Sequence, residues 1–189
     1  MTYQPTFRKQ ADGSRCQWQN CNCASSAMAT DRHRLGVDPV LPTGWLPMPA
    51  EIRQKISTAI CRGTSHNENR DACKALYGVT LEPRYDVPWA TFQSLIISGR
   101  GAATSIRYSV IHGTKYDACP TFYGGHDIYV NERRASDGAY LVSDPLADGR
   151  RAGIPKGPQW WPGSLLKAAA AAWTGAGLVD AMFTRDTEV

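Results

Sequence analysis

The sequence lacks any long apolar run. No stretch approaches the ~18 consecutive apolar residues that are needed to cross a bilayer, and the opening segment MTYQPTFRKQADGS has no apolar centre of the kind that marks a secretion signal. We therefore expect a protein that is made in the cytoplasm and has no membrane as a partner.

Charge of one sign is also scarce. The 189 residues carry 21 basic and 17 acidic side chains, which leaves a formal net charge of +4. The longest basic runs are Arg133-Arg134 and Arg150-Arg151, and no row of aromatic residues accompanies them, so nucleic acid is not an expected partner. Hydrophobic residues make up 42% of the chain, which is enough for a packed core, and the length suits a single domain over 1–189.

Cysteine is present without a metal-binding pattern. Cys16, Cys21 and Cys23 are spaced C-x4-C-x-C, and no C-x2-C pair exists, so a structural zinc site is not expected. Cys61 and Cys73 flank a polar stretch whose ends could meet, but thiols made in a reducing compartment normally stay reduced. We expect both to be free thiols.

Hydrophobic spacing, with glycine stops at several ends, predicts helices in the N-terminal half and one near the C-terminus, at 21–35, 51–60, 67–77, 89–97 and 164–173. Extended pieces are expected at 79–81 and 84–85. Four prolines within residues 37–50 make 37–66 an irregular insertion, and residues 1–14 form a polar leader.

The C-terminal half changes to alternating β-branched and aromatic residues, which predict strands at 102–110, 126–131 and 139–143. The turn signal Ser136-Asp137-Gly138 joins the last two strands in a hairpin. Helices followed by antiparallel strands predict an α+β domain.

Two cysteines, Cys21 and Cys23, lie at the start of the first predicted helix. The positive end of a helix and a nearby imidazole together stabilise a thiolate, so a cysteine in this position is a candidate nucleophile. The two positions differ by ~200° around the helix, and only one can face a given partner. We expect Cys21 to lie on the inward stripe with Ala24, Ala27 and Met28, and Cys23 to lie off that stripe.

Four histidines compete to be the partner of that cysteine. His33 lies in a basic helix end and His66 in a polar loop, where we expect solvated rings, and His112 follows a strand end. His126 differs because it follows Gly124-Gly125, where the backbone can approach another segment closely and leave one face of the imidazole uncovered.

The hairpin supplies a third residue. A turn centred near residue 135 places Asp144 beside His126, within a register error of one or two residues, and a carboxylate there can orient the imidazole. The alternative for each residue alone is that Asp144-Pro145 only begins a turn and His126 only begins a strand. Taken together, the helix-start cysteine, the histidine and the aspartate favour a catalytic triad.

These residues resemble a known family. The segment NCNCASSAM resembles the nucleophile helix of the bacteriocin-processing (double-glycine) branch of papain-like cysteine peptidases, whose pattern is approximately D-C-G-P-A-S-L-A-M, and matching A-S-x-A-M puts Cys21 at the nucleophile. Gly125-His126 and Asp144-Pro145 follow the family's order of a Gly-His strand and a later Asp-Pro. The D-R-H-x-L-G and Y-G-V segments are similar to small proteins of actinobacterial phages, found in tail genes or as the peptidase part of lysins.

In this family a glutamine six residues before the nucleophile helps to bind the oxyanion. Six residues before Cys21 is Arg15, whereas six residues before Cys23 is Gln17, in a frame that loses the A-S-x-A-M match. We prefer Cys21 with Gln17 or Gln19 as the donor, and Cys23 is then a small buried helix residue.

The resemblance implies a papain-like fold, with an N-terminal nucleophile helix packed on a C-terminal antiparallel sheet. It implies that Cys21 attacks an amide carbonyl, that His126 protonates the leaving amine and that Asp144 holds the imidazole tautomer, without a metal or other cofactor. A phage protein of this kind would be made in the host cytoplasm, join other tail proteins in the virion and cut stem peptides of bacterial peptidoglycan. The alternatives are a structural tail-tip or tail-hub subunit without required activity and the peptidase part of an endolysin.

Overall fold

The computed structural model describes residues 21–37, 49–56, 63–147, 149 and 155–184, and for residues 21–22 and 34–37 it describes the backbone course only. The helices are α1 (Cys21–Val37), α2 (Pro49–Ile56), α3 (His66–Tyr77), α4 (Trp89–Ile97), the short 3-10 helix η2 (Tyr108–Ile111) and α5 (Gly163–Thr174). The strands are β1 (Glu82–Pro88), β2 (Ala102–Arg107), β3 (Gly125–Arg133), β4 (Tyr140–Ser143), β5 (Gln159–Trp161) and β6 (Leu178–Phe183). Within these residues no helix combines the length and apolar character of a membrane span.

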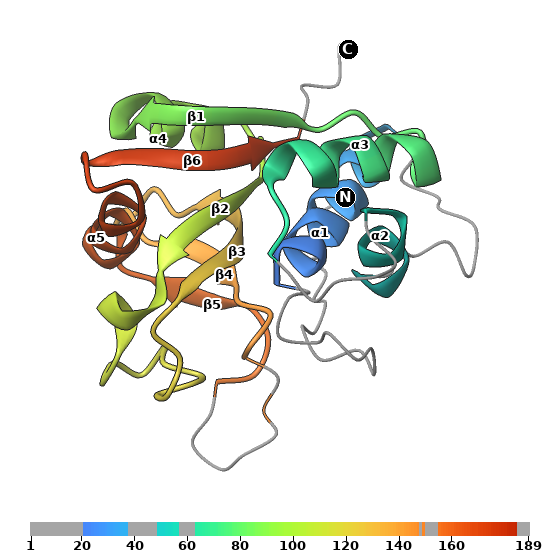
Figure 1. Cartoon of the computed structure of the whole chain (residues 1–189). Helices are drawn as coiled ribbons and strands as arrows, with labels where there is room; N and C mark the ends of the chain where they lie inside the picture. Colours follow the sequence, from blue (N-terminus) through green and yellow to red (C-terminus); the bar gives the residue numbers. More distant parts are fainter. Residues whose placement is uncertain (1–20, 38–48, 57–62, 148, 150–154, 185–189) are drawn as a thin grey trace.

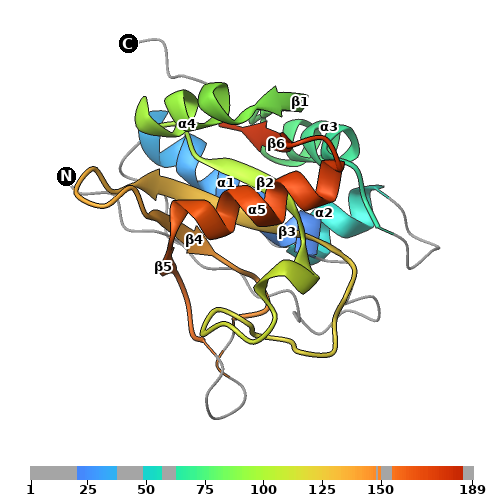
Figure 2. The same ribbon diagram turned by 90° about the vertical axis from the view of Figure 1, so that its left-hand side faces the viewer.

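The strands form one antiparallel sheet with the order β1-β6-β2-β3-β4-β5. In Figure 1, β2 and β3 separate α5 on one side from α1 on the other, and Figure 2 shows α5 crossing in front of these strands. The N-terminal helix therefore packs on a C-terminal antiparallel sheet, as expected.

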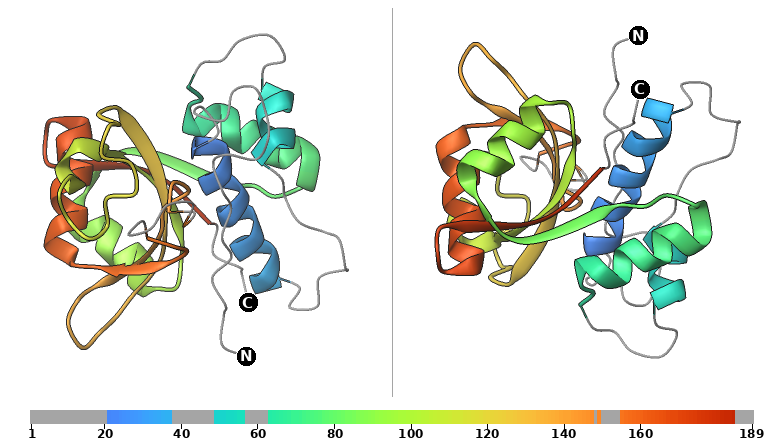
Figure 3. Two further views of the ribbon diagram at one scale, coloured as in Figure 1. Left: turned by 90° about the horizontal axis from the view of Figure 1, so that it is seen from below. Right: turned by 90° about the horizontal axis from the view of Figure 1, so that it is seen from above.

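Two apolar cores lie on the two faces of this sheet. The first is enclosed by α4, α5 and the curled sheet, and includes Ile128 and Val130 of β3. The second lies between the other face and α1, α2 and α3, and includes Tyr129 of β3. Figure 3 shows the sheet curled around the first core with α1, α2 and α3 grouped beside it. Because side chains alternate along a strand, β3 is buried on both faces.

The predicted hairpin is present, with a register that differs slightly from the expected one. Tyr129 pairs with Ser143, and the register shifts by one residue between Val130 and Glu132. The shift leaves Asn131 outside the ladder, and its amide donates hydrogen bonds to the carbonyl of Leu141 and to Ser143 Oγ, at 3.2 and 3.0 Å. This β-bulge adds one residue to β3, so each residue of β4 beyond it pairs one position earlier on β3 than it would without the bulge.

Several boundaries differ from the sequence predictions. The first helix continues through Gly36 to Val37, and the second begins at Pro49 and is described to Ile56, so positions 57–60 of its predicted span lie outside the described residues. The strand expected at 102–110 ends at Arg107, where η2 begins. β5 and β6 were not predicted from the sequence, although β6 occupies an inner position between β1 and β2. The leader at 1–14 lies outside the described residues.

Candidate active site

His126 and Asp144 form a buried pair. The Nε2 atom of His126 lies 2.7 Å from Oδ1 of Asp144, and the two side chains are 0% and 3% exposed. The same Oδ1 accepts the backbone N–H of Leu146 at 2.8 Å, which fixes the carboxylate. The expected contact between these two residues is therefore present.

The β-bulge explains how the pair meets. Continuing the register from Tyr129 and Ser143 places Asp144 opposite Ile128, on the same face of the sheet as His126. Diagonal neighbours of this kind lie within reach of long side chains. The two residues were predicted to lie directly opposite each other within one or two residues, and the observed offset of two residues lies within that range.

The imidazole of His126 is enclosed more fully than expected. The rings of Tyr108 and Phe122 approach it edge-on, with centroids at 5.2 and 6.1 Å, and the residue is only 2% exposed. Tyr108 is itself fixed, because its hydroxyl accepts the backbone N–H groups of Ala118 and Cys119. Burial and the nearby Asp144 raise the pKa of Tyr108, so its hydroxyl stays protonated. The expectation of an uncovered imidazole face was wrong.

The glycines before His126 allow another segment to approach, as predicted. A Cβ atom on Gly125 would overlap the ring of Trp173 at the end of α5, and one on Gly124 would come within 2.9 Å of the ring of Phe122. The indole of Trp173 also lies under the guanidinium of Arg107, 5.4 Å from the ring centroid. Glycine at position 125 thus brings α5 against the start of β3.

A cavity of about 470 Å³ opens beside this pair. The rings of Tyr85, Phe122 and Trp173 form part of its wall, together with two histidines and two aspartates. Its lining consists of Gly63, Thr64, Ser65, His66, Tyr85, Ser105, Phe122, Gly124, Gly125, His126, Asp127, Trp173 and Asp180.

The candidate nucleophile is located through its helix. Cys21 is the first residue of α1, and its side chain lies outside the described part, as do Gln17 and Gln19. Ser25, one turn later, donates a hydrogen bond from Oγ to the backbone carbonyl of Asp127 at 2.8 Å. Helical spacing puts position 21 on the Ser25 side of α1, and this side faces the start of β3.

Cys23 is fully buried in the second core, beside a group that includes Ala27, Met28, Ile52 and Cys73. The expectation that Cys23 lies off the inward stripe was wrong. Every residue of α1 from Cys23 to Asp31 is buried, because the sheet covers one side of the helix while α2 and α3 cover others. A small buried helix residue remains the interpretation of Cys23.

The prediction that His66 is solvated in a polar loop was wrong. The residue is 3% exposed, not solvated, and its Nε2 lies 2.9 Å from Oδ2 of Asp127. Ser105 donates from Oγ to Oδ1 of the same carboxylate at 2.7 Å. Burial would raise the pKa of Asp127, but the charge of His66 and the hydrogen bonds from His66 and Ser105 hold it below its usual value. The capping box formed by Ser65 and Glu68 was the available signal, because it makes His66 the first residue of α3.

The other two histidines are not in the cavity wall. The Nε2 atom of His112 lies 2.9 Å from the carbonyl oxygen of Phe122, and its ring packs against Tyr123. His33 is partly buried in α1 rather than solvated. Among the described residues no group of three or more His, Cys, Asp or Glu side chains is arranged to hold a metal ion.

The fold is the α+β fold of papain-like cysteine peptidases, with an N-terminal helix packed on an antiparallel sheet. The chain is similar in structure to a crystal structure described as that of a C39-like peptidase from Bacillus anthracis, with a TM-score of 0.62 over 97% of this chain and 96% of that chain. Their sequences are 10% identical, so the likeness concerns the fold. No family model matches the chain, and no curated protein matches its sequence.

Proposed function

We propose that this protein is a cysteine peptidase in which Cys21, His126 and Asp144 form the catalytic triad. The observation that carries the proposal is the buried contact between Asp144 and His126, together with the packing of the first turns of α1 on β3, the strand that carries His126. The fold supports the same assignment.

The pair defines which imidazole nitrogen does the chemistry. Asp144 accepts the proton of Nε2, so Nδ1 is the basic nitrogen of His126. The carboxylate stabilises the imidazolium that forms when Nδ1 takes a proton, and this stabilisation is strong because the pair is removed from water. Position 21 lies at the positive end of α1, which favours the thiolate of Cys21.

In the first step the thiolate of Cys21 attacks the carbonyl carbon of a peptide bond. As the C–N bond breaks, the imidazolium of His126 gives its Nδ1 proton to the leaving amine, and a thioester remains. His126 then takes a proton from water, which attacks the thioester and releases the acid and the thiolate. The backbone N–H of residue 21 and the amide of Gln17 or Gln19 would hold the oxyanion in both steps.

The substrate and the biological setting rest on the sequence resemblance to actinobacterial phage proteins. We propose a virion tail component that cuts stem peptides or cross-links of bacterial peptidoglycan, together with other tail proteins. A cavity with aromatic walls beside His126 can bind a peptide side chain.

The test is hydrolysis of purified cell walls by the full-length protein, with release of new amino groups as the readout. Wild-type protein should release them and Cys21→Ser should not, whereas Cys23→Ser should retain activity. Absence of hydrolysis by the wild type, with the chain present in purified virions, would instead favour a structural tail-tip or tail-hub subunit. Presence in lysates but not in virions would favour an endolysin.

A further inference from the structure

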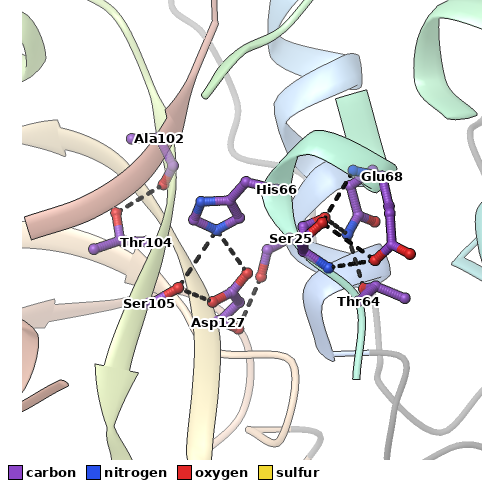
Figure 4. Close-up of polar contacts among 10 residues, drawn as sticks. Ser25, Thr64, His66, Glu68, Ala102, Thr104, Ser105 and Asp127 are labelled. Carbon is purple, nitrogen blue, oxygen red and sulfur yellow. Dashed lines mark hydrogen bonds and ion pairs between the residues drawn. The ribbon is translucent and has the colours of Figure 1, made fainter. Parts of the chain in front are cut away.

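Asp127 connects three other elements to β3 at the residue directly after His126. Its carboxylate accepts from Ser105 of β2 and faces Nε2 of His66 on α3, at 2.7 and 2.9 Å. Its backbone carbonyl accepts from Ser25 of α1 at 2.8 Å. Figure 4 shows His66, Ser105 and Ser25 converging on this residue from separate elements.

The cluster is not a second catalytic triad. In a serine triad the hydroxyl and the carboxylate contact different nitrogens of the imidazole. Here Ser105 Oγ lies 3.5 Å from Nε2 of His66, the same nitrogen that faces Asp127, and it donates its proton to the carboxylate. Ser105 is therefore not arranged as a nucleophile that His66 could activate.

The charge of Asp127 is needed for the contacts of its carboxylate with Ser105 and His66, whereas the contact with Ser25 uses the backbone carbonyl. Through His66 the carboxylate holds α3, which packs on α1. Asp127 is 2% exposed, and a buried carboxylate is costly unless donors surround it. Its ionised form accepts from Ser105 and His66 together. An asparagine at this position would turn one oxygen into an N–H donor that opposes one of these two partners.

We propose that Asp127 is a positioning residue that sets the first turns of α1 against β3, and thereby sets Cys21 against His126. His126 and Asp127 are consecutive residues that both line the cavity, and Ser25 is one turn from position 21. A shift of about 1 Å between reacting groups can cost roughly 100-fold in rate, so this anchor affects the chemistry. The inference rests on the proposed function, because it assigns Asp127 to the same reaction.

The test compares Asp127→Asn with Thr184→Val in the full-length protein. Thr184 is equally buried, and its hydroxyl accepts the N–H of Gly101 at 3.1 Å at the opposite end of β2, so this variant also loses a buried polar contact. Two quantities are measured at pH 7: the rate at which iodoacetamide labels Cys21, followed by peptide mass spectrometry, and hydrogen exchange of the amides of α1.

Asp127→Asn should slow the labelling of Cys21 at least about tenfold and accelerate exchange in the first turns of α1, while Thr184→Val leaves labelling within about twofold of the wild type. If Cys21 in Asp127→Asn is labelled at the wild-type rate, the inference about Asp127 is overturned, whereas the proposed function is not. If Cys21 of the wild type reacts no faster than Cys119, the proposed function fails. In that case hydrogen exchange alone tests whether Asp127 anchors α1. Equal exchange rates of the α1 amides in Asp127→Asn and Thr184→Val would show that it does not.

Discussion

Asp144 hydrogen-bonds His126 although the two residues are not directly opposite each other in the hairpin. The register places Asp144 opposite Ile128, which lies two residues beyond His126 on β3. The one-residue bulge at Asn131 and the fixed carboxylate of Asp144 bring the two side chains together on one face of the sheet. The geometry of the candidate site therefore depends on an irregularity in the hairpin.

Replacing Asp144 by Asn should slow the labelling of Cys21 by iodoacetamide at pH 7 by at least about tenfold. The amide still accepts from Nε2 of His126 but no longer stabilises the imidazolium by its charge. Asp137→Asn is the matched control, because Asp137 lies in the turn of the same hairpin, where it pairs with Arg134 at the surface. Equal labelling rates in wild type and Asp144→Asn would contradict the role assigned to the carboxylate.

Gly125→Ala should destabilise the protein by about 1–3 kcal/mol, because the added methyl overlaps the indole of Trp173. Urea unfolding measures the effect. Combining Gly125→Ala with Trp173→Ala should cost less than the sum of the two single changes, since the smaller side chain relieves the overlap. Gly63→Ala is the control, because a Cβ there meets no atom of the described residues within 4 Å. Additive costs in the double variant would mean that Trp173 is not the obstacle.

The hairpin and its histidine–aspartate contact could be predicted because their signals are local. Ser136-Asp137-Gly138 marks the turn, and counting outward from it reaches both His126 and Asp144. The bulge could not be foreseen, because it depends on Asn131 bonding across the strands to Leu141 and Ser143. It moves the pairing beyond it by one residue, and this places Asp144 on the same face of the sheet as His126.

The contact between His66 and Asp127 could not be predicted in the same way. The two residues are 61 positions apart, and they meet only because α3 and β3 pack beside α1. The burial of Cys23 has a similar cause, since enclosure of α1 by the sheet, α2 and α3 removes the exposed face that a helical wheel assumes. β6 did leave a signal in the sequence, because Val179, Ala181 and Phe183 are apolar residues at alternating positions after Gly175 and Gly177.

Asp127 should make the stability of the protein sensitive to acid. Its pKa in the folded state is below the usual value, so its stabilising contribution is present above the unfolded-state pKa of about 4 and is lost as the pH falls through the folded-state pKa. The difference in free energy of unfolding between wild type and Asp127→Asn should therefore shrink below about pH 4. Urea unfolding of both proteins from pH 7 to pH 2 measures it. A difference that stays constant over this range would show that Asp127 is not ionised in the folded protein.

Cys73 should be inert in the folded protein. Burial raises the pKa of its thiol to about 11, and only the thiolate is nucleophilic. Iodoacetamide at pH 8 should label Cys73 at a rate that rises with urea in parallel with unfolding. Rapid labelling of Cys73 in the absence of urea would contradict the packing of α3 against α1.

The labelling of Cys21 as a function of pH, in wild type and in His126→Asn, tests the proposed function most directly. If His126 and the start of α1 stabilise the thiolate, Cys21 of the wild type should react at pH 6 to 7 much faster than Cys119, and His126→Asn should move this reactivity toward the pH of an ordinary thiol, about 8.5. Peptide mass spectrometry assigns the label to individual cysteines. Equal reactivity of Cys21 and Cys119 in the wild type, or a pH profile that His126→Asn leaves unchanged, would contradict the triad of Cys21, His126 and Asp144.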